Sequence, residues 1–191
     1  MTDPLLKTDR TTVEVLGKGV LNLRPLMTKI GAILQQQAQA SFRRQRRGRV
    51  PWAPRMTPNV PGIVADLNAG RSPPGRRFTG RPALVDTGRL RNSITFRATA
   101  STVTVGTSVK YAGVQQEGGT TKHKLTTAGR ARLVELLQQR PDLREDLGWL
   151  FKKPEFTVKV RPRRFLDVTP EDVSKIRKML KAHLEGGSSG R

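Results

Sequence analysis

The feature that most constrains the fold is a change of hydrophobic period at Ser93. After this residue, apolar side chains recur at every second position in two short runs, with polar side chains between them. Such alternation is typical of strands that bury one face, and the gap between the runs has the length of a turn. We therefore predict an antiparallel pair of half-buried strands joined at Thr99 to Ser101, with an inward face of Ile94, Phe96, Ala98, Val103 and Val105.

A short helix is predicted before this pair and a loop after it. Leu90 lies one helical turn before Ile94, so Arg89 to Ser93 is predicted to be helical. Asp86-Thr87-Gly88 leads into it, and a short oxygen-bearing side chain at this point can cap the helix. Beyond the strands, Tyr111-Ala112 is expected to leave the sheet and open a loop with two paired glycines.

The longest predicted helix runs from Arg24 to Arg47. Pro25 suits its first turn, where the missing N–H costs nothing, and apolar residues recur at spacings of three and four. The basic end, R-R-Q-R-R-G-R, complements the helix dipole, and Gly48 can take the left-handed position after the helix. The same run can also contact a polyanion, and the two interpretations are compatible. The apolar stripe consists of Leu26, Ile30, Ile33, Leu34, Ala38 and Phe42.

Both ends of the chain carry further predicted elements. Thr11 to Leu16 alternates and is predicted to be a strand, after a largely polar stretch, Met1 to Arg10, that is not expected to join the core. Phe156 to Val160 also alternates and is predicted to join the central pair. Thr169-Pro170-Glu171-Asp172 is typical of a helix start. That helix is predicted to end at Gly186, after an apolar stripe of Val173, Ile176, Met179 or Leu180, and Leu184.

The segment from Val50 to Pro82 shows little periodicity and contains seven prolines and four glycines. Long loops without regular structure are usually functional or disordered. We expect a flexible basic arm that becomes ordered on assembly, in which only Ile63 to Leu67 forms a single helical turn.

The segment from Thr120 to Glu155 is predicted to be an inserted helical hairpin. Thr126 or Thr127 can cap a first helix, a proline stops it, and Asp142 can cap a second. The apolar face of the second helix, which includes Trp149 and Phe151, packs either on the protein's own sheet or on a neighbouring subunit.

Several short motifs follow one another along the chain. They are Leu84-x-x-Thr87-Gly88-x-Leu90-x-x-Ser93-Ile94, then Tyr111-Ala112 with Gln116-x-Gly118, and finally Arg161-Pro162-Arg163-x-Phe165-Leu166. In this order they resemble the virion morphogenesis, or tail completion, family of Mu-like tailed bacteriophages, which is similar to the neck and tail-completion proteins of other long-tailed phages. Trp52 matches a tryptophan that often follows the first helix in that family, although it can also simply cap the core. The segment 120–155 is longer than the family leads us to expect.

The resemblance implies an α+β fold over residues 23–185, with residues 1–22 as an N-terminal segment and 186–191 as a flexible tail. The expected domain is a small antiparallel sheet packed by a long N-terminal helix and a C-terminal helix. It also carries the inserted helical hairpin at 120–155 and the long Pro/Gly/Arg-rich arm at 50–82. Arg161 to Leu166 is expected to be a structural joint, because Pro162 ends the strand. Phe165 and Leu166 should be buried there, and Arg163 and Arg164 partly exposed.

The implied function is structural. The resemblance suggests a tail completion or neck subunit that forms a homo-oligomeric ring, expected to be a hexamer, at the head-proximal end of the tail. The implied partners are the tail tube or tail terminator protein and the head–tail connector, with DNA in the lumen as a further partner and no membrane. The protein is expected in the virion tail or neck, and in the host cytoplasm before assembly. Candidate ring-interface residues are Tyr111, Gln115, Gln116, Glu117, Trp149 and Phe151. Candidate structural motif residues are Trp52, Thr87, Gly88, Leu90, Ile94, Arg161, Pro162, Phe165 and Leu166.

The net charge of +21 supports a second function, that of a sequence-nonspecific nucleic-acid-binding protein. From Arg43 to Arg97 there are 13 arginines, no lysine and two acids, a net charge of +11. The guanidinium fork binds phosphate or carboxylate with two parallel hydrogen bonds. Basic residues are not interleaved with aromatic ones, so no platform for base stacking is apparent. Candidate polyanion contacts are Arg43, Arg44, Arg46, Arg47, Arg71, Arg76 and Arg77.

The sequence offers little for catalysis. There is no cysteine, which excludes disulfides and thiolate metal sites and suits a reducing compartment. No phosphate-binding glycine loop or carboxylate pair is apparent, and His123 and His183 lie far apart, with His123 expected to be exposed. No apolar run approaches the roughly 18 residues that a membrane span needs. We expect no enzymatic activity, cofactor or metal.

Overall fold

The central sheet forms where the change of period predicts it. In the computed structural model, which describes residues 6–8, 11–15, 23–80 and 82–186, β5 (Ile94–Ala98) pairs antiparallel with β6 (Thr102–Thr107). The strand order is β1-β2-β6-β5, with β1 (Leu6–Thr8) and β2 (Thr12–Val15) beyond β6. The predicted N-terminal strand is thus confirmed at β2, and Leu16 lies outside the described residues. The first ten residues were not expected to join the core, and within them β1 pairs with β2 at the edge of the sheet.

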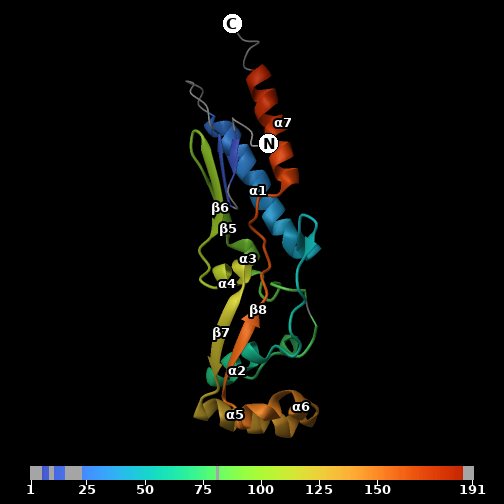
Figure 1. Cartoon of the computed structure of the whole chain (residues 1–191). Coiled ribbons are helices and arrows are strands. Elements are labelled where there is room, and N and C mark those ends of the chain that lie inside the picture. Colours follow the sequence, from blue (N-terminus) through green and yellow to red (C-terminus); the bar gives the residue numbers. More distant parts are fainter. Residues whose placement is uncertain (1–5, 9–10, 16–22, 81, 187–191) are drawn as a thin grey trace.

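Two helices, α1 (Arg24–Arg44) and α7 (Pro170–Gly186), complete the predicted α+β architecture around this sheet (Figure 1). The helix α1 packs on β5 and β6, and α7 packs on α1. Gly31 allows α1 to lie close to β5, because a Cβ at this position would overlap the ring of Phe96. This proximal core buries Val13, Met27, Ile30, Leu34, Phe42, Ile94, Val103, Phe165 and Ile176.

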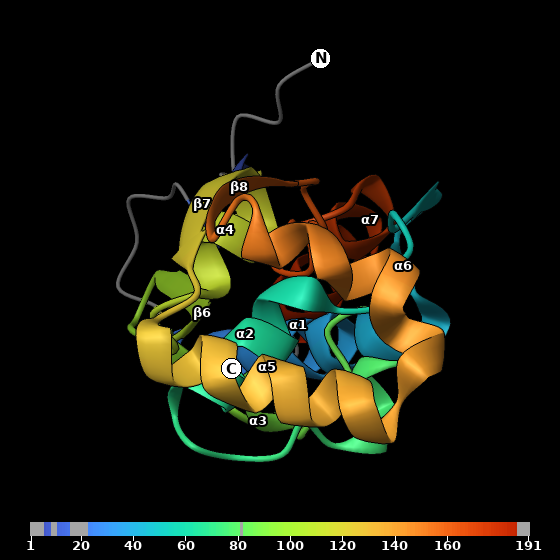
Figure 2. The ribbon, with the colours of Figure 1, turned by 90° about the horizontal axis from the view of Figure 1, so that it is seen from below.

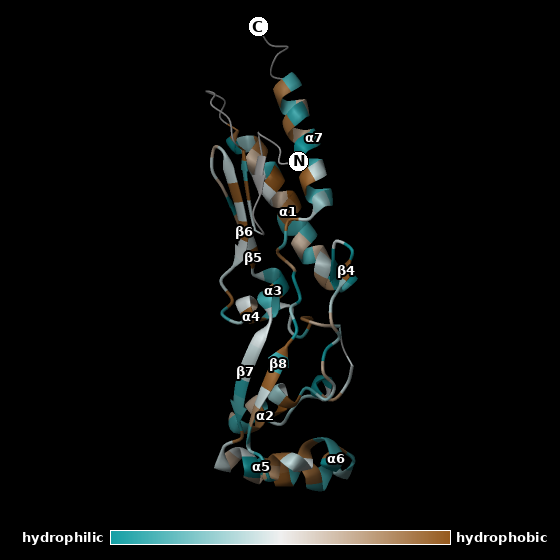
Figure 3. Cartoon of the chain, viewed as in Figure 1, coloured by the Kyte–Doolittle hydropathy of each residue, from teal (hydrophilic) through white to brown (hydrophobic). Residues whose placement is uncertain are grey.

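The helix α7 extends beyond the end of α1 (Figure 1), and Figure 3 shows hydrophobic and hydrophilic residues mixed along its length. Val173, Ile176, Met179 and Leu180 contribute to the proximal core as predicted. Leu184 does not, because it is 46% exposed on the projecting last turns, and its inclusion in the buried stripe is a wrong prediction.

The helix α1 ends three residues earlier than predicted. Gln45 takes the left-handed C-cap position, φ 52°, in place of Gly48. Its side chain bonds the carbonyls of Phe42 and Ala83, which offsets the strain of this conformation. The remaining arginines then form β3 (Arg46–Arg47), which pairs with β4 (Val50–Pro51) in a tight hairpin.

The C-terminal strand does not join the central pair. The strand β8 (Glu155–Val160) pairs instead with β7 (Gly119–Lys124), in a separate two-stranded sheet. Of the central pair, β6 already has β2 on its other side, and β8 pairs with β7 and not with the remaining edge at β5. Before β7, the expected loop is also partly helical, since α4 (Ala112–Glu117) leads from the central sheet into the hairpin.

The β7–β8 hairpin carries the inserted helices to the far end of an elongated molecule (Figures 1 and 2). These are α5 (Thr127–Gln139), α6 (Arg144–Leu147) and the flanking 3-10 turns Pro141–Leu143 and Gly148–Phe151. Thr126 caps α5 as predicted, by accepting a hydrogen bond of 3.1 Å from the N–H of Gly129.

The insertion packs mainly on α2 (Val60–Asn68), and neither predicted alternative included this helix. The expectation that 50–82 holds a single helical turn is therefore wrong, because α2 has nine residues and is followed by a 3-10 turn, Gly75–Arg77. Apolar residues of α2 recur at helical spacing and find partners on the insertion. This distal core buries Val60, Ile63, Val64, Leu67, Leu125, Leu133, Leu137, Leu143, Leu147 and Leu150.

Candidate assembly surface

The Arg-Pro-Arg-Arg-Phe-Leu segment is a structural joint, built around three aromatic rings. Phe165 is fully buried, with its ring centroid 5.4 Å from that of Phe42. Trp52 packs edge-on against Phe42, also at 5.4 Å, and its indole N–H donates to the carbonyl of Arg164 at 2.9 Å. Trp52 therefore caps the proximal core. The predicted burial of Phe165 is confirmed, whereas Leu166 is only half-buried.

The short helix α4 fastens this joint through two glutamines. The side-chain oxygen of Gln116 accepts hydrogen bonds from the N–H groups of Phe165 at 2.9 Å and Leu166 at 3.2 Å. Its amide nitrogen donates to Asp167 at 2.7 Å, and the residue is only 6% exposed. Gln115 accepts from the backbone N–H and the guanidinium of Arg163. Gln116 is thus an internal clamp, and its assignment to a subunit surface is corrected, because a side chain with all its bonds inside the fold cannot reach a neighbour.

Arg47 is likewise internal. Its guanidinium donates to Asp172 at 2.8 Å and to the carbonyl of Asp167 at 2.7 Å. Burial lowers the pKa of Arg47, and the nearby Asp172 and Asp167 act in the opposite direction. Asp172 also accepts from the N–H of Thr169, whose hydroxyl accepts from the N–H of Asp172, so a capping box begins α7. The assignment of Arg47 to a polyanion surface is therefore wrong.

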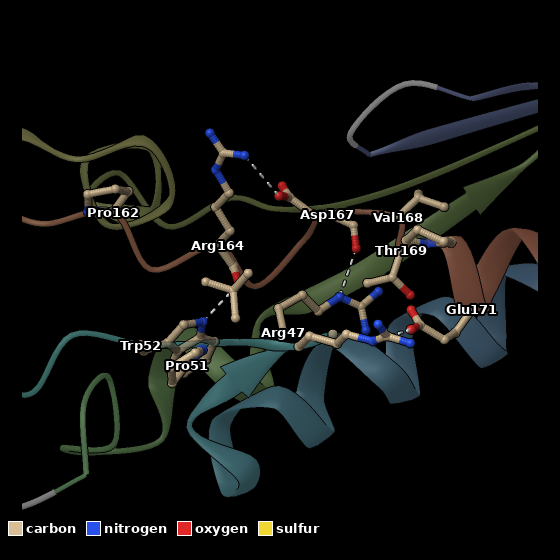
Figure 4. A pocket seen from close by; sticks show the side chains of 13 residues that line it. Arg47, Pro51, Trp52, Pro162, Arg164, Asp167, Val168, Thr169 and Glu171 are labelled. Carbon is tan, nitrogen blue, oxygen red and sulfur yellow. Dashed lines mark hydrogen bonds and ion pairs between the residues drawn. The ribbon is translucent and has the colours of Figure 1, made fainter.

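A groove of about 730 Å³ lies beside this ion pair, between the β3–β4 hairpin, the joint and the start of α7. Figure 4 shows Arg47 reaching across it towards Asp167, with Trp52 and Pro162 on the other side. Val50, at the start of β4, is 70% exposed. The joint thus has a buried half that holds the fold together and an open half that faces outward.

The other arginines of the predicted basic surface fall into two groups. Arg43, Arg44 and Arg46 are exposed at the end of α1 and on β3. The three from the 71–77 segment belong to an ion-pair network. Arg77 contacts Asp66 at 2.9 Å and Asp86 at 3.2 Å, Arg71 contacts Asp66 at 3.4 Å, and Arg76 contacts Asp86 at 2.7 Å. Since its side chain is 16% exposed and holds two carboxylates, Arg77 is corrected from a polyanion contact to a structural residue.

The exposed apolar candidates lie apart from one another. Tyr111 is exposed beside α4, where Glu117 is also exposed. Trp149 is 38% exposed at the distal end and packs edge-on against Phe156 of β8, while Phe151 is half-buried. The six interface candidates therefore do not form one patch.

The titratable residues of the described part form no group of three or more that could hold a metal ion. His123, expected to be exposed, is half-buried and stacks on Phe156 with ring centroids 5.3 Å apart. Burial lowers its pKa below the ordinary value of 6.5. Within the same part of the chain, no helix has the length and apolarity of a membrane span.

The sequence model of the phage virion morphogenesis family matches residues 7–185. The chain belongs to this family. The match extends from β1 to the last turns of α7, so it includes the central sheet, the joint and the distal insertion. As a member of the phage virion morphogenesis family, the protein has a structural role in forming the phage particle. No curated protein and no solved structure matches the chain.

Two contacts that hold this family member together could not be found from its sequence. Asn68 at the end of α2 donates to the carbonyl of Lys124 at 2.7 Å and accepts from the N–H of Thr126 at 3.0 Å. It thereby ties α2 to the start of α5. The clamp made by Gln116 is similar, since an asparagine or glutamine carries no signal of its distant partner.

Proposed function

We propose that the protein is a tail completion or neck subunit, of the kind found in Mu-like phages, which forms a ring at the head-proximal end of the tail and joins the tail to the head connector. The observation that carries the proposal is the family match over residues 7–185, which covers both cores of the molecule. The ring is expected to contain six copies, with the tail tube or tail terminator protein on one side and the connector on the other.

The arrangement of the molecule supports a ring. A closed ring needs two different faces that complement each other, since each subunit meets one neighbour on either side. Tyr111, near the middle of the molecule, and Trp149, at its distal end, are two exposed aromatic anchors that different neighbours could bury. Aromatic side chains of this kind are enriched among the residues that dominate interface energies.

The proposal is tested by removing the protein from an infection and imaging the lysate. We expect full heads and tails that remain separate, or tails of abnormal length, and restoration by the wild-type protein supplied in trans. A Tyr111→Ala variant should restore fewer joined particles than Lys110→Ala, which changes the adjacent exposed residue. Normal joined particles in the absence of the protein would contradict the proposal.

A nucleic-acid-binding function remains the second candidate, because Arg43, Arg44 and Arg46 are exposed in one short segment. If these residues contact duplex DNA, the logarithm of the affinity should fall with the logarithm of salt by about 0.9 for each phosphate neutralised. Changing the three arginines to glutamine should then reduce that slope. An unchanged slope, or infectious DNA-filled particles from the variant, would show that these arginines do not contact DNA and are only the solvent-exposed end of α1.

A further inference from the structure

A second cavity lies at the waist of the molecule, between the proximal and distal cores. This waist cleft has a volume of about 830 Å³. The segment 54–61, which ends in the first turn of α2, and the segment 83–86 form one side of it, and the β7–β8 hairpin with residues 161–163 forms the other. Figure 1 shows the hairpin spanning this middle region, between α4 and α2. Residues already described, among them Arg77, Gln115 and Arg163, line part of it, but their structural roles do not require an open cleft.

The charged residues that line the waist cleft are almost all cationic. Four arginines take part, namely Arg55, Arg77, Arg161 and Arg163, whereas Asp86 is the single carboxylate among the described lining residues. Asp86 is already shared between Arg76 and Arg77. The cleft therefore has an excess of positive charge that its own acid does not neutralise.

Arg163 shows this excess most clearly. Its guanidinium donates to the carbonyls of Ala53 and Pro54, both at 2.9 Å, and to the side-chain oxygen of Gln115 at 3.1 Å. All three acceptors are neutral, and no described carboxylate forms an ion pair with Arg163. Burial alone lowers the pKa of this half-buried side chain. A cation partly removed from water without a counter-charge is unfavourable, and a bound anion relieves that cost.

The remaining walls of the cleft are largely apolar. They include Leu84 and Val85 on one side and Val158 and Val160 on the other. Thr121 lies opposite Val158 in the hairpin, so these two residues share the half-buried face that looks into the cleft. Among the described lining residues there is no Phe, Tyr or Trp, and the ring of His123 is already stacked on Phe156. A ligand suited to it carries negative charge and apolar side chains together.

We propose that the waist cleft binds a short, carboxylate-rich peptide segment of a neighbouring protein in the tail. Arginine clusters recognise acidic motifs in this way, with carboxylates on the guanidinium forks and an apolar anchor between them. Single-stranded nucleic acid fits poorly, since it favours aromatic side chains on which its bases stack. A second copy of this chain also fits poorly, because its 15 acidic residues are scattered and never occur more than two in a row. The proposal deepens the proposed function and rests on it for the identity of the partner as a tail protein.

The test uses fluorescence anisotropy with the full chain and a labelled peptide of about eight glutamates and two leucines. A matched peptide with glutamine in place of glutamate, and a single-stranded oligonucleotide, serve as comparison probes. The double variant Arg55→Gln/Arg161→Gln should weaken binding of the glutamate peptide about tenfold, because hydrogen-bonded charges are lost. The control double variant Arg89→Gln/Arg97→Gln removes the same charge from two exposed residues outside the cleft and should change binding less than about twofold.

A third variant separates shape from charge. Thr121→Trp fills the cleft without changing any charge and should also weaken binding about tenfold. Far-ultraviolet circular dichroism checks that each variant folds. If Thr121→Trp does not fold, the single variant Arg161→Gln, which changes an exposed residue, still tests whether the cleft binds the glutamate peptide.

Three results would overturn the proposal. The two double variants could weaken binding equally, in which case the peptide is attracted only by the net positive charge of the whole chain. The glutamine peptide could bind as tightly as the glutamate peptide. The oligonucleotide could displace the peptide and show the same loss with Arg55→Gln/Arg161→Gln, which would assign the cleft to nucleic acid. Each of these leaves the depletion experiment on tail joining untouched, so the two proposals fail independently.

Discussion

Replacing Gln116 by alanine should destabilise the proximal half of the molecule by about 2–4 kcal/mol. The substitution leaves the N–H of fully buried Phe165 and that of half-buried Leu166 without their acceptor, and Asp167 without a donor. An unsatisfied buried polar group costs on the order of 1–3 kcal/mol, and water can reach part of this site. Gln115→Ala is the matched control, because Arg163 keeps its two carbonyl acceptors there, and it should cost less than about 1 kcal/mol.

The two tryptophans make this measurement specific to one core. Trp52 lies in the proximal core and Trp149 at the distal end. In a Trp149→Phe background, the fluorescence of Trp52 during urea titration reports the proximal core alone. Gln116→Glu should fall between wild type and alanine, since a carboxylate still accepts both N–H groups but repels Asp167. Equal urea midpoints for Gln116→Ala and Gln115→Ala would refute the clamp.

Three further predictions follow from the packing and the charges. Phe165→Ala should cost about 3–5 kcal/mol in the same titration, because it leaves a cavity between Phe42 and the joint; an unchanged midpoint would contradict its place in the core. Gly31→Ala should lower the free energy of unfolding by about 1–3 kcal/mol, because the added methyl overlaps the ring of Phe96. The double variant Gly31→Ala/Phe96→Leu should recover part of that stability. If it is no more stable than Gly31→Ala, the contact with Phe96 is not the cause of the loss. For His123, the pKa in the folded state is lowered by burial, so the unfolded state binds more protons and stability falls as pH drops through the ordinary value of 6.5. The difference in urea midpoint between pH 7.5 and 5.5 should therefore shrink in His123→Gln, and an identical difference in both proteins would contradict this.

The sequence predicted elements whose signals are local. The alternation from Ile94 to Val105 gave the central strands, and Thr169 to Asp172 gave the start of α7. Prediction from the sequence failed for elements whose packing or pairing partner lies far away along the chain. The partner of β8 could not be deduced from F-T-V-K-V, because alternation shows that a strand has a buried face and not which edge it joins. The separate β7–β8 sheet was missed for that reason.

Composition also concealed α2. Prolines and glycines within α2 and on both sides of it suggested an unstructured arm. However, Val60, Ile63, Val64 and Leu67 have helical spacing and pack on the insertion. In the candidate site, sequence reasoning found Trp52 and Phe165 as anchors. It placed Arg47, Arg77 and Gln116 on the surface, because neither charge nor an amide group indicates whether a partner lies within the same chain.

The path of the chain between the two cores has a mechanical consequence. Residues 24–52, 83–112 and 165–186 contribute to the proximal half, whereas 60–68 and 125–151 build the distal half. The polypeptide therefore runs between the two halves four times. A force along the long axis divides among four segments in parallel, and two of these, β7 and β8, are hydrogen-bonded to each other along their length. Twisting one half against the other must strain all four at once. The molecule thus transmits tension and torque from one end to the other as a single stiff body, whereas two domains joined by one linker would move independently.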